Sequence, residues 1–158
     1  LDWRLRTDER VVVLDKTNVR SLTPDDIGGP VDLVVADLSF ISLKLVLGAL
    51  AACSAEGGDL LPMVKPQFEV GKQRLGSGGV VRDPGLRAEA VLDVLAAAAG
   101  HGLHPRGVTA SPLPGPSGNV EFFAWLRKGA PAADSDRPDP EELVRAAVEA
   151  GPQGPRRR

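Results

Sequence analysis

Two short runs rich in valine constrain the fold of this chain more than any other feature. Residues 11–15 read VVVLD and residues 31–37 read VDLVVAD, the second entered through Gly28-Gly29-Pro30. Their hydrophobicity is continuous rather than alternating, as is typical of parallel strands covered by helices on both faces. Each run ends in an acidic residue, at the end of the strand where open α/β sheets bind ligands. The sequence therefore predicts a doubly wound α/β sheet with a site at that edge.

Two helices and three further strands are expected after these runs. Ser42 is a typical N-cap for a helix that continues to about residue 55, with Gly57-Gly58 as its stop. Asp83 followed by Pro84 begins a second helix that reaches residue 99. The strands are expected at residues 59–65, 103–112 and 119–128, the last two as an antiparallel pair. This order is that of the second half of a doubly wound sheet.

Composition separates a domain from a tail and excludes several classes of protein. Residues 1–128 are expected to form the domain, and residues 129–158 a flexible Pro/Ala/Arg-rich tail with one candidate amphipathic helix at 140–150. The net charge of −2 excludes a partner held by bulk positive charge alone. A single cysteine, Cys53, excludes a disulfide framework and fits the reducing cytoplasm. No run is long enough to span a membrane, and no cluster of ligands predicts a metal site.

Three ionisable residues interrupt apolar runs near the predicted strand ends. They are Asp37, Lys65 and Glu121. A charge flanked by buried residues is costly unless it is paired, so a lysine between two carboxylates is a physically sensible cluster. The cluster has two interpretations from the residues alone, a structural ion pair and a catalytic centre.

A long connection at residues 66–83 carries the basic residues Lys72, Arg74 and Arg82 among several glycines. Backbone donors and guanidinium groups suit phosphate, so this loop is a candidate for RNA binding. The alternative is a solvated flexible loop.

Four motifs together resemble the TlyA (hemolysin A-like) family of FtsJ-type methyltransferases. They are VADLSFIS at residues 35–42, VKPQFEVG at 64–71, GGVVRD at 78–83 and GNVEFF at 118–123. The resemblance covers about residues 1–128. It implies a partial class I methyltransferase (Rossmann-like) sheet with a C-terminal antiparallel strand pair. The activity implied is S-adenosyl-L-methionine-dependent 2′-O-methylation of cytidine in 16S and 23S ribosomal RNA, with ribosomal subunits as partners.

The resemblance also implies roles for individual residues. Asp37, Lys65 and Glu121 match three members of a Lys-Asp-Lys-Glu catalytic tetrad, and Asn18, Val19 and Asp37 match cofactor contacts. An ordinary Asx turn is the alternative for Asn18. The first lysine of the tetrad, the Gly-rich turn that cradles the cofactor, the acidic residue that holds its ribose and the S4 RNA-binding domain have no counterpart. We therefore expect this chain alone neither to bind S-adenosyl-L-methionine well nor to methylate.

Two other functions compete with ribose methylation. Residues 37–40, DLSF, are a distant variant of the Asp-Pro-Pro-Tyr signature of methyltransferases that act on base amino groups. The second alternative is a non-catalytic RNA-binding or interaction module that uses the basic loop.

Overall fold

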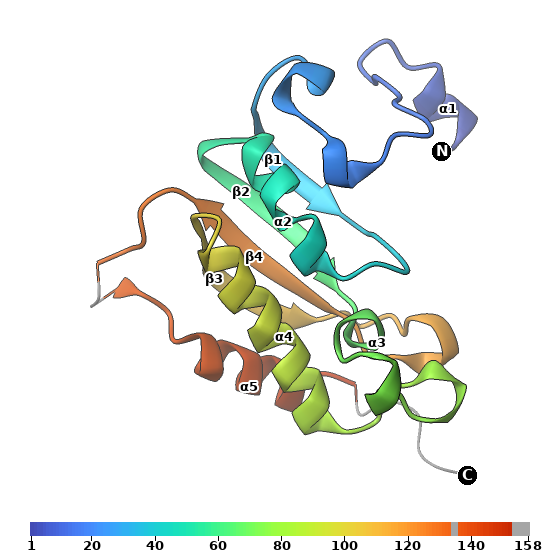
Figure 1. Cartoon of the computed structure of the whole chain (residues 1–158), viewed down its shortest axis with the longest axis vertical. Helices are drawn as coiled ribbons and strands as arrows, with labels where there is room; N and C mark the ends of the chain where they lie inside the picture. The colour runs from blue at the N-terminus through green and yellow to red at the C-terminus, as the bar shows by residue number, and fades with distance from the viewer. Residues whose placement is uncertain (134–135, 153–158) are drawn as a thin grey trace.

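The centre of the molecule is a mixed four-stranded sheet (Figure 1). The computed structural model describes residues 1–133 and 136–152. The strands lie in the order β1-β2-β4-β3, with β1 and β2 parallel and the other two pairs antiparallel. The α/β class and the antiparallel pair at the C-terminal side are confirmed. The strands are β1 (Val31–Ala36), β2 (Ser54–Val64), β3 (Leu103–Ala110) and β4 (Phe122–Lys128).

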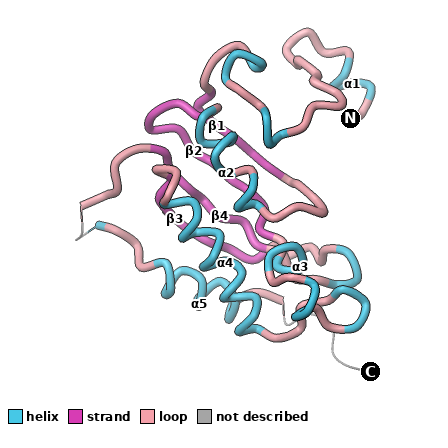
Figure 2. The backbone as a smooth tube through the Cα atoms, in the orientation of Figure 1, coloured by secondary structure: helices cyan, strands magenta, loops and turns pink. Residues whose placement is uncertain are grey.

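Three helices cover one face of this sheet: α2 (Leu47–Ala52), α4 (Pro84–Ala99) and α5 (Pro140–Ala150) (Figure 2). Two single-turn helices, α1 (Trp3–Arg6) and α3 (Pro66–Glu69), lie outside this layer. The start of α4 follows the prediction, because the Asp83 carboxylate accepts a hydrogen bond from the Leu86 amide at 2.9 Å.

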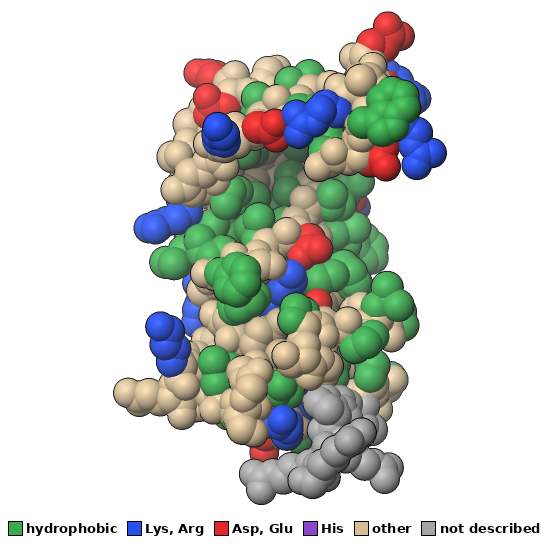
Figure 3. Space-filling view, turned by 90° about the vertical axis from the view of Figure 1, so that its right-hand side faces the viewer, with side chains coloured by type: hydrophobic (Ala, Val, Ile, Leu, Met, Phe, Trp, Pro, Cys, Tyr) green, Lys and Arg blue, Asp and Glu red, His purple; other side chains and the backbone are tan. Residues whose placement is uncertain are grey.

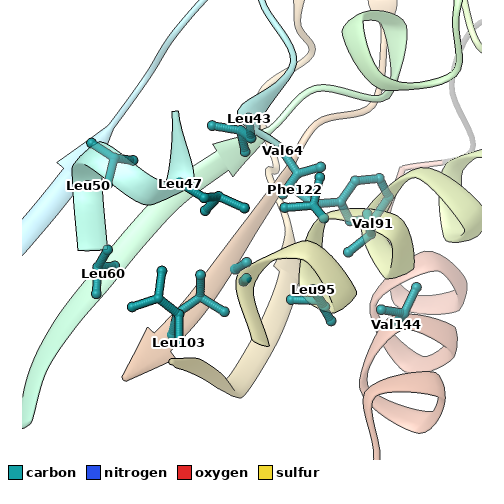
Figure 4. Packing of buried hydrophobic residues seen from close by; sticks show 14 of the residues in the cluster. Leu43, Leu47, Leu50, Leu60, Val64, Val91, Leu95, Leu103, Phe122 and Val144 are labelled. Atoms are coloured by element: carbon teal, nitrogen blue, oxygen red, sulfur yellow. The ribbon is translucent and has the colours of Figure 1, made fainter. Parts of the chain in front are cut away.

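The core lies between the helices and the sheet (Figure 4). Leu47 of α2, Val91 of α4 and Phe122 of β4 have no exposed surface. Each such side chain contributes about 1.5–3 kcal/mol to the free energy of unfolding by leaving water. This packing fixes β2 and β4 side by side, and with them the ends of the strands that carry the candidate site.

The opposite face of the sheet is bare within the described residues. Leu33 and Val35 of β1 are 56% and 71% exposed, and Trp125 of β4 is 41% exposed. The expectation of helices on both faces is therefore wrong for this chain. No described helix covers the outward side chains of β1, which is also the edge strand of the sheet.

The strand predicted at residues 11–15 does not form. The segment is irregular, and Val12 is 83% exposed. A strand needs a neighbour that accepts its backbone hydrogen bonds, and no described strand lies beside these residues. An ion pair between Arg6 and Asp15, with an N–O distance of 2.7 Å, ties the end of this segment to α1 instead.

The predicted boundary between the first helix and the following strand is also wrong. Ser42 caps a short 3-10 turn, Leu43–Leu45, through its hydroxyl. Helix α2 then ends at Ala52, and β2 begins at Ser54. Gly57 and Gly58 lie inside β2, where the pairing with β1 slips between Val31↔Ser54 and Leu33↔Asp59. A Cβ on Gly58 would lie 3.2 Å from the Asp32 carbonyl oxygen, so the glycines allow a bulge close to β1.

Part of the region expected to be a flexible tail belongs to the core. Helix α5 packs against β3 and α4, and its Val144 and Ala147 are buried. The apolar face of the helix requires a partner, and the surface of α4 and β3 supplies it. The arginines at 156–158 lie outside the described residues. None of the described helices is both long and apolar enough to cross a membrane.

Candidate active site

Lys65 and Asp37 form an ion pair at one edge of the sheet. β1 and β2 are parallel neighbours, so the residues that follow the two strands lie close together at the carboxyl ends of the strands. Figure 3 views the molecule from this side. The Lys65 Nζ lies 2.6 Å from Asp37 Oδ1, and it donates a second hydrogen bond to the Ser39 hydroxyl at 3.1 Å. The side chain of Lys65 is 8% exposed, whereas that of Asp37 is 70% exposed. A buried ammonium group is thus held by an open carboxylate.

Glu121 lies at the same edge, immediately before β4. The antiparallel ladder pairs Val64 with Phe122, so Lys65 and Glu121 follow at facing positions. Glu121 is buried, and its carboxylate accepts a hydrogen bond from the side-chain amide of Gln67 at 2.9 Å. A Cβ on Gly115 would overlap this carboxylate, so only glycine leaves room for it. The structure brings the three predicted residues to one edge, with Lys65 contacting Asp37 and Glu121 contacting Gln67.

Glu69 fastens the loop after β1 to the helix after β2. Its carboxylate accepts hydrogen bonds from the Ser42 hydroxyl at 2.6 Å and from the Leu43 amide at 2.7 Å. Charge-assisted bonds of this kind are stronger than neutral ones. The loop that carries Asp37 and Ser39 is therefore held at both ends, by β1 and by Glu69.

A cavity of about 450 Å³ adjoins these residues. Phe40 on its wall is 91% exposed and has a φ of +62°, which is rare for a side chain of this size. Its ring lies 5.3 Å from that of Phe68, at an angle of 49°. The cavity is lined by Phe40, Ile41, Ser42, Gln67, Phe68, Gly71, Lys72, Leu75 and Gly79. An apolar, aromatic wall with one amide and one ammonium group suits a flat polar ring.

The three basic residues of the loop have different surroundings. Lys72 is exposed and lines the cavity. Arg74 is paired with Glu89 of α4 and donates to the Val70 carbonyl oxygen at 3.0 Å. Arg82 donates to the Ser77 carbonyl oxygen at 3.1 Å. Lys72 therefore has the freest charge of the three, while Arg74 is already neutralised.

The candidate cofactor residues lie on a 3-10 turn, Val19–Ser21. The Asn18 side chain accepts a hydrogen bond from the Arg20 amide at 3.1 Å, which is the Asx turn expected as the structural alternative. Val19 packs against the main core. Among the described residues, no group of three or more His, Cys, Asp or Glu lies close enough to hold a metal ion.

Sequence reasoning missed Ser39, Phe40, Gln67 and Glu69 as site residues. All four lie within the recognised motifs, close to Asp37 or Lys65. They escaped notice because their importance comes from contacts between two loops rather than from charge at a strand end. The one available signal in the sequence was that Gln67, a polar residue, lies two positions after the candidate catalytic Lys65.

The fold and the site define an α/β domain with a lysine–carboxylate centre at the carboxyl edge of its sheet. The FtsJ-like methyltransferase family matches residues 1–128. The chain belongs to this family.

Individual relatives agree with this assignment. The chain is 59% identical to the 16S/23S rRNA (cytidine-2′-O)-methyltransferase TlyA of Mycobacterium tuberculosis, over 96% of this chain and 56% of the relative. Solved structures described as hemolysins superpose with a TM-score of 0.83 for Streptococcus thermophilus and 0.82 for Lactococcus lactis. The Streptococcus thermophilus structure is 36% identical, and the match covers 94% of this chain and 54% of the solved chain. The Lactococcus lactis structure is 35% identical, and the match covers 91% of this chain and 69% of the solved chain. The chain spans about half the length of the curated relatives it matches.

Proposed function

We propose that this domain transfers a methyl group to the 2′-hydroxyl of a cytidine in ribosomal RNA, as part of a longer protein. The observation that carries the proposal is the buried ammonium group of Lys65, held by Asp37 and Ser39 at the sheet edge. The name of the Mycobacterium tuberculosis relative supports the same substrate. The expected partners are ribosomal subunits in the cytoplasm.

The residues present fit S-adenosyl-L-methionine as the methyl donor. The open carboxylate of Asp37 suits a cationic sulfonium group, and Asn18 and Val19 offer a turn for the adenine. When bound, this cofactor supplies an activated methyl group on sulfur.

Lys65 is the central residue of the proposed reaction. A ribose hydroxyl has a high pKa, so its oxygen needs a cation beside it as it gives up its proton to solvent and takes the methyl group, whose bond to sulfur would break and leave its electron pair on the sulfur. Asp37 and Ser39 occupy two of the three ammonium protons of Lys65, which leaves one for the ribose oxygen. Glu121, held by Gln67, orients the cluster and the ribose.

RNA would approach over the cavity and the basic loop. Lys72 provides the free charge beside the cavity, and Arg82 adds a second cation on the same loop. Arg74 contributes to RNA binding after exchanging Glu89 for phosphate. The phosphate contacts of the two arginines position RNA without reading its sequence.

The test is methylation by the full-length protein that carries this domain, with Lys65→Ala and Lys65→Arg variants. We expect both variants to lose at least about a hundredfold in rate, because the ammonium group is the proposed electrostatic catalyst. The readout is 2′-O-methylcytidine in ribosomal RNA, measured by nucleoside mass spectrometry. Lys44→Ala, at an exposed lysine 3.9 Å from Asp93, is the matched control and should keep full activity.

Other outcomes decide between the competing functions. Methyl groups found on a base amino group would favour an amino methyltransferase. Full activity of Lys65→Ala would overturn the assigned role of this lysine. Absence of any methylation, together with RNA binding that is lost on replacing Lys72, Arg74 and Arg82 by Ala, would favour a non-catalytic binding module.

A further inference from the structure

The buried amide of Gln67 is only half satisfied. The residue is 7% exposed, and its Nε2 donates to Glu121 at 2.9 Å. Within the described part of the chain, its Oε1 has no hydrogen-bond partner. A buried acceptor without a partner is costly, and native proteins keep few of them without a reason. Because this atom has almost no accessible surface, a donor on a ligand in the neighbouring cavity reaches it only when the surrounding side chains move slightly.

The contact with Glu121 fixes which end of the amide is free. Turning the amide by 180° would place Oε1 against the carboxylate oxygen of Glu121, and two acceptors repel each other. The nitrogen therefore stays on Glu121, and the free atom is always the oxygen. Gln67 presents an acceptor and not a donor.

Gln67 also lines the cavity of about 450 Å³ that Phe40 and Phe68 border. The aromatic rings suit the face of a pyrimidine, and Lys72 on the same wall supplies a donor. Within the described residues, no ion pair occupies the Lys72 ammonium group. The cavity thus combines one acceptor, Gln67, with one free donor, Lys72.

We propose that Gln67 determines the specificity for cytidine by accepting a hydrogen bond from the 4-amino group of the target base. Position 4 of cytosine is a donor and N3 is an acceptor, which match Gln67 and Lys72 respectively. Uracil reverses both, with an acceptor at O4 and a donor at N3. The inference rests on the proposed function and adds the residue that selects the base.

The first experiment measures kcat/KM of the full-length protein on ribosomal RNA transcripts that carry cytidine or uridine at the methylated position. We expect the unchanged protein to prefer cytidine, and Gln67→Leu to lower that preference about tenfold, as expected for one lost hydrogen bond. Gln67→Leu also removes the contact with Glu121, but that loss lowers kcat/KM for the cytidine and uridine transcripts alike. The ratio of the two kcat/KM values therefore reports only the effect of the free oxygen. Gln73→Leu, at an exposed glutamine outside the cavity, is the matched control and should keep the ratio.

The second experiment changes the RNA instead of the protein. Replacing the target cytidine by pyrimidin-2-one ribonucleoside removes the 4-amino group alone. We expect about a tenfold loss of kcat/KM in the unchanged protein and no loss in Gln67→Leu, since effects on contacting groups are not additive. Equal losses in the two proteins, or an unchanged preference in Gln67→Leu, would overturn the proposal.

A third measurement separates this inference from the proposed function. Side-chain amide signals of Gln67 are followed by NMR while cytidine or uridine 5′-monophosphate is added to the full-length protein. We expect cytidine monophosphate to shift these signals at lower concentration than uridine monophosphate. Absence of methyl transfer would reject the proposed function. Equal responses of the Gln67 signals to the two nucleotides would reject the role of Gln67, whether or not a methyl group is transferred.

Discussion

Asp59 on β2 holds two side chains of the neighbouring strand β4. Its carboxylate accepts hydrogen bonds from Arg127 at 3.0 Å and from the Trp125 indole at 2.8 Å. The hydrogen bond from Arg127, followed by that from Trp125, lowers the pKa of Asp59 from its usual value. Asp59 and Arg127 are also direct partners in the ladder, so this contact fixes the register of the two strands that carry Lys65 and Glu121.

The lowered pKa predicts an acid-dependent loss of stability. A carboxylate whose pKa is lower in the folded state stabilises the fold above its unfolded pKa, about 3.9, and loses this contribution as the pH falls through the folded value. We expect Asp59→Asn to lower Tm by a few degrees at pH 7, and this difference to shrink as the pH falls through the folded pKa of Asp59. Thermal unfolding followed across pH checks this. Asp32→Asn, at an exposed aspartate of β1, is the control, and an equal drop there would contradict the explanation.

Asn119 joins two loops that belong to different elements. It is 3% exposed, and its Oδ1 accepts from the Val81 amide at 3.0 Å. Its Nδ2 donates to the carbonyl oxygens of Gly79 and Pro116, each at 3.1 Å. The first loop carries Arg82 and the second leads into Glu121. One side chain therefore connects the proposed RNA-binding loop to the proposed catalytic edge.

Removing this connection should affect both loops. We expect Asn119→Ala to lower the free energy of unfolding by about 2 kcal/mol, because the Val81 amide is left buried without an acceptor. Hydrogen exchange at the Val81 amide should become faster, and methylation should fall by more than the lost stability explains. Asn119→Asp keeps the acceptor and should preserve slow exchange at Val81. Unchanged exchange in Asn119→Ala would show that the contact has no structural role.

Elements with local signals could be predicted from the sequence, and those that depend on neighbours could not. Helix α4 follows its predicted bounds because Asp83 and Pro84 are local start signals. The valines at 11–13 have the same strand propensity as β1, yet β1 pairs with β2 and residues 11–13 have no described strand beside them. Glycine is common both at the ends of helices and in β-bulges, so the pair Gly57-Gly58 alone does not distinguish a helix stop from the bulge that the structure has inside β2.

In the candidate site, too, some residues could be predicted from local sequence signals and others depend on contacts with distant residues. Asp37 and Lys65 follow parallel strands, so their proximity could be predicted from strand order alone. Gln67 and Glu69 acquire their roles through contacts with Glu121 and Ser42, which no local pattern reveals. Charge at a strand end is visible in a sequence, whereas a neutral side chain that closes a network is visible only in three dimensions.

At the scale of the whole molecule, the strand that carries Asp37 has little support on one side. Leu33 and Val35 of β1 are largely exposed, and β1 pairs only with β2 among the described strands. An edge strand with an uncovered face is mobile and prone to association.

We therefore expect residues 1–158 alone to bind S-adenosyl-L-methionine poorly. The Asp37 loop is held by Glu69 and Lys65, but the strand that leads into it has one uncovered face, and local opening of that strand lowers the affinity for a cofactor. Isothermal titration calorimetry of the isolated chain checks this, with the full-length protein as the control. A dissociation constant as low as that of the full-length protein would contradict the expectation.

The outer edge of β1 has a practical consequence as well. The backbone groups on this edge, which no described strand pairs, lie next to the exposed side chains of Leu33 and Val35 and can accept a strand supplied by a separate polypeptide. An enzyme of this family could accordingly be produced as two fragments that regain activity only on meeting. Such a pair would report the proximity of any two proteins fused to them.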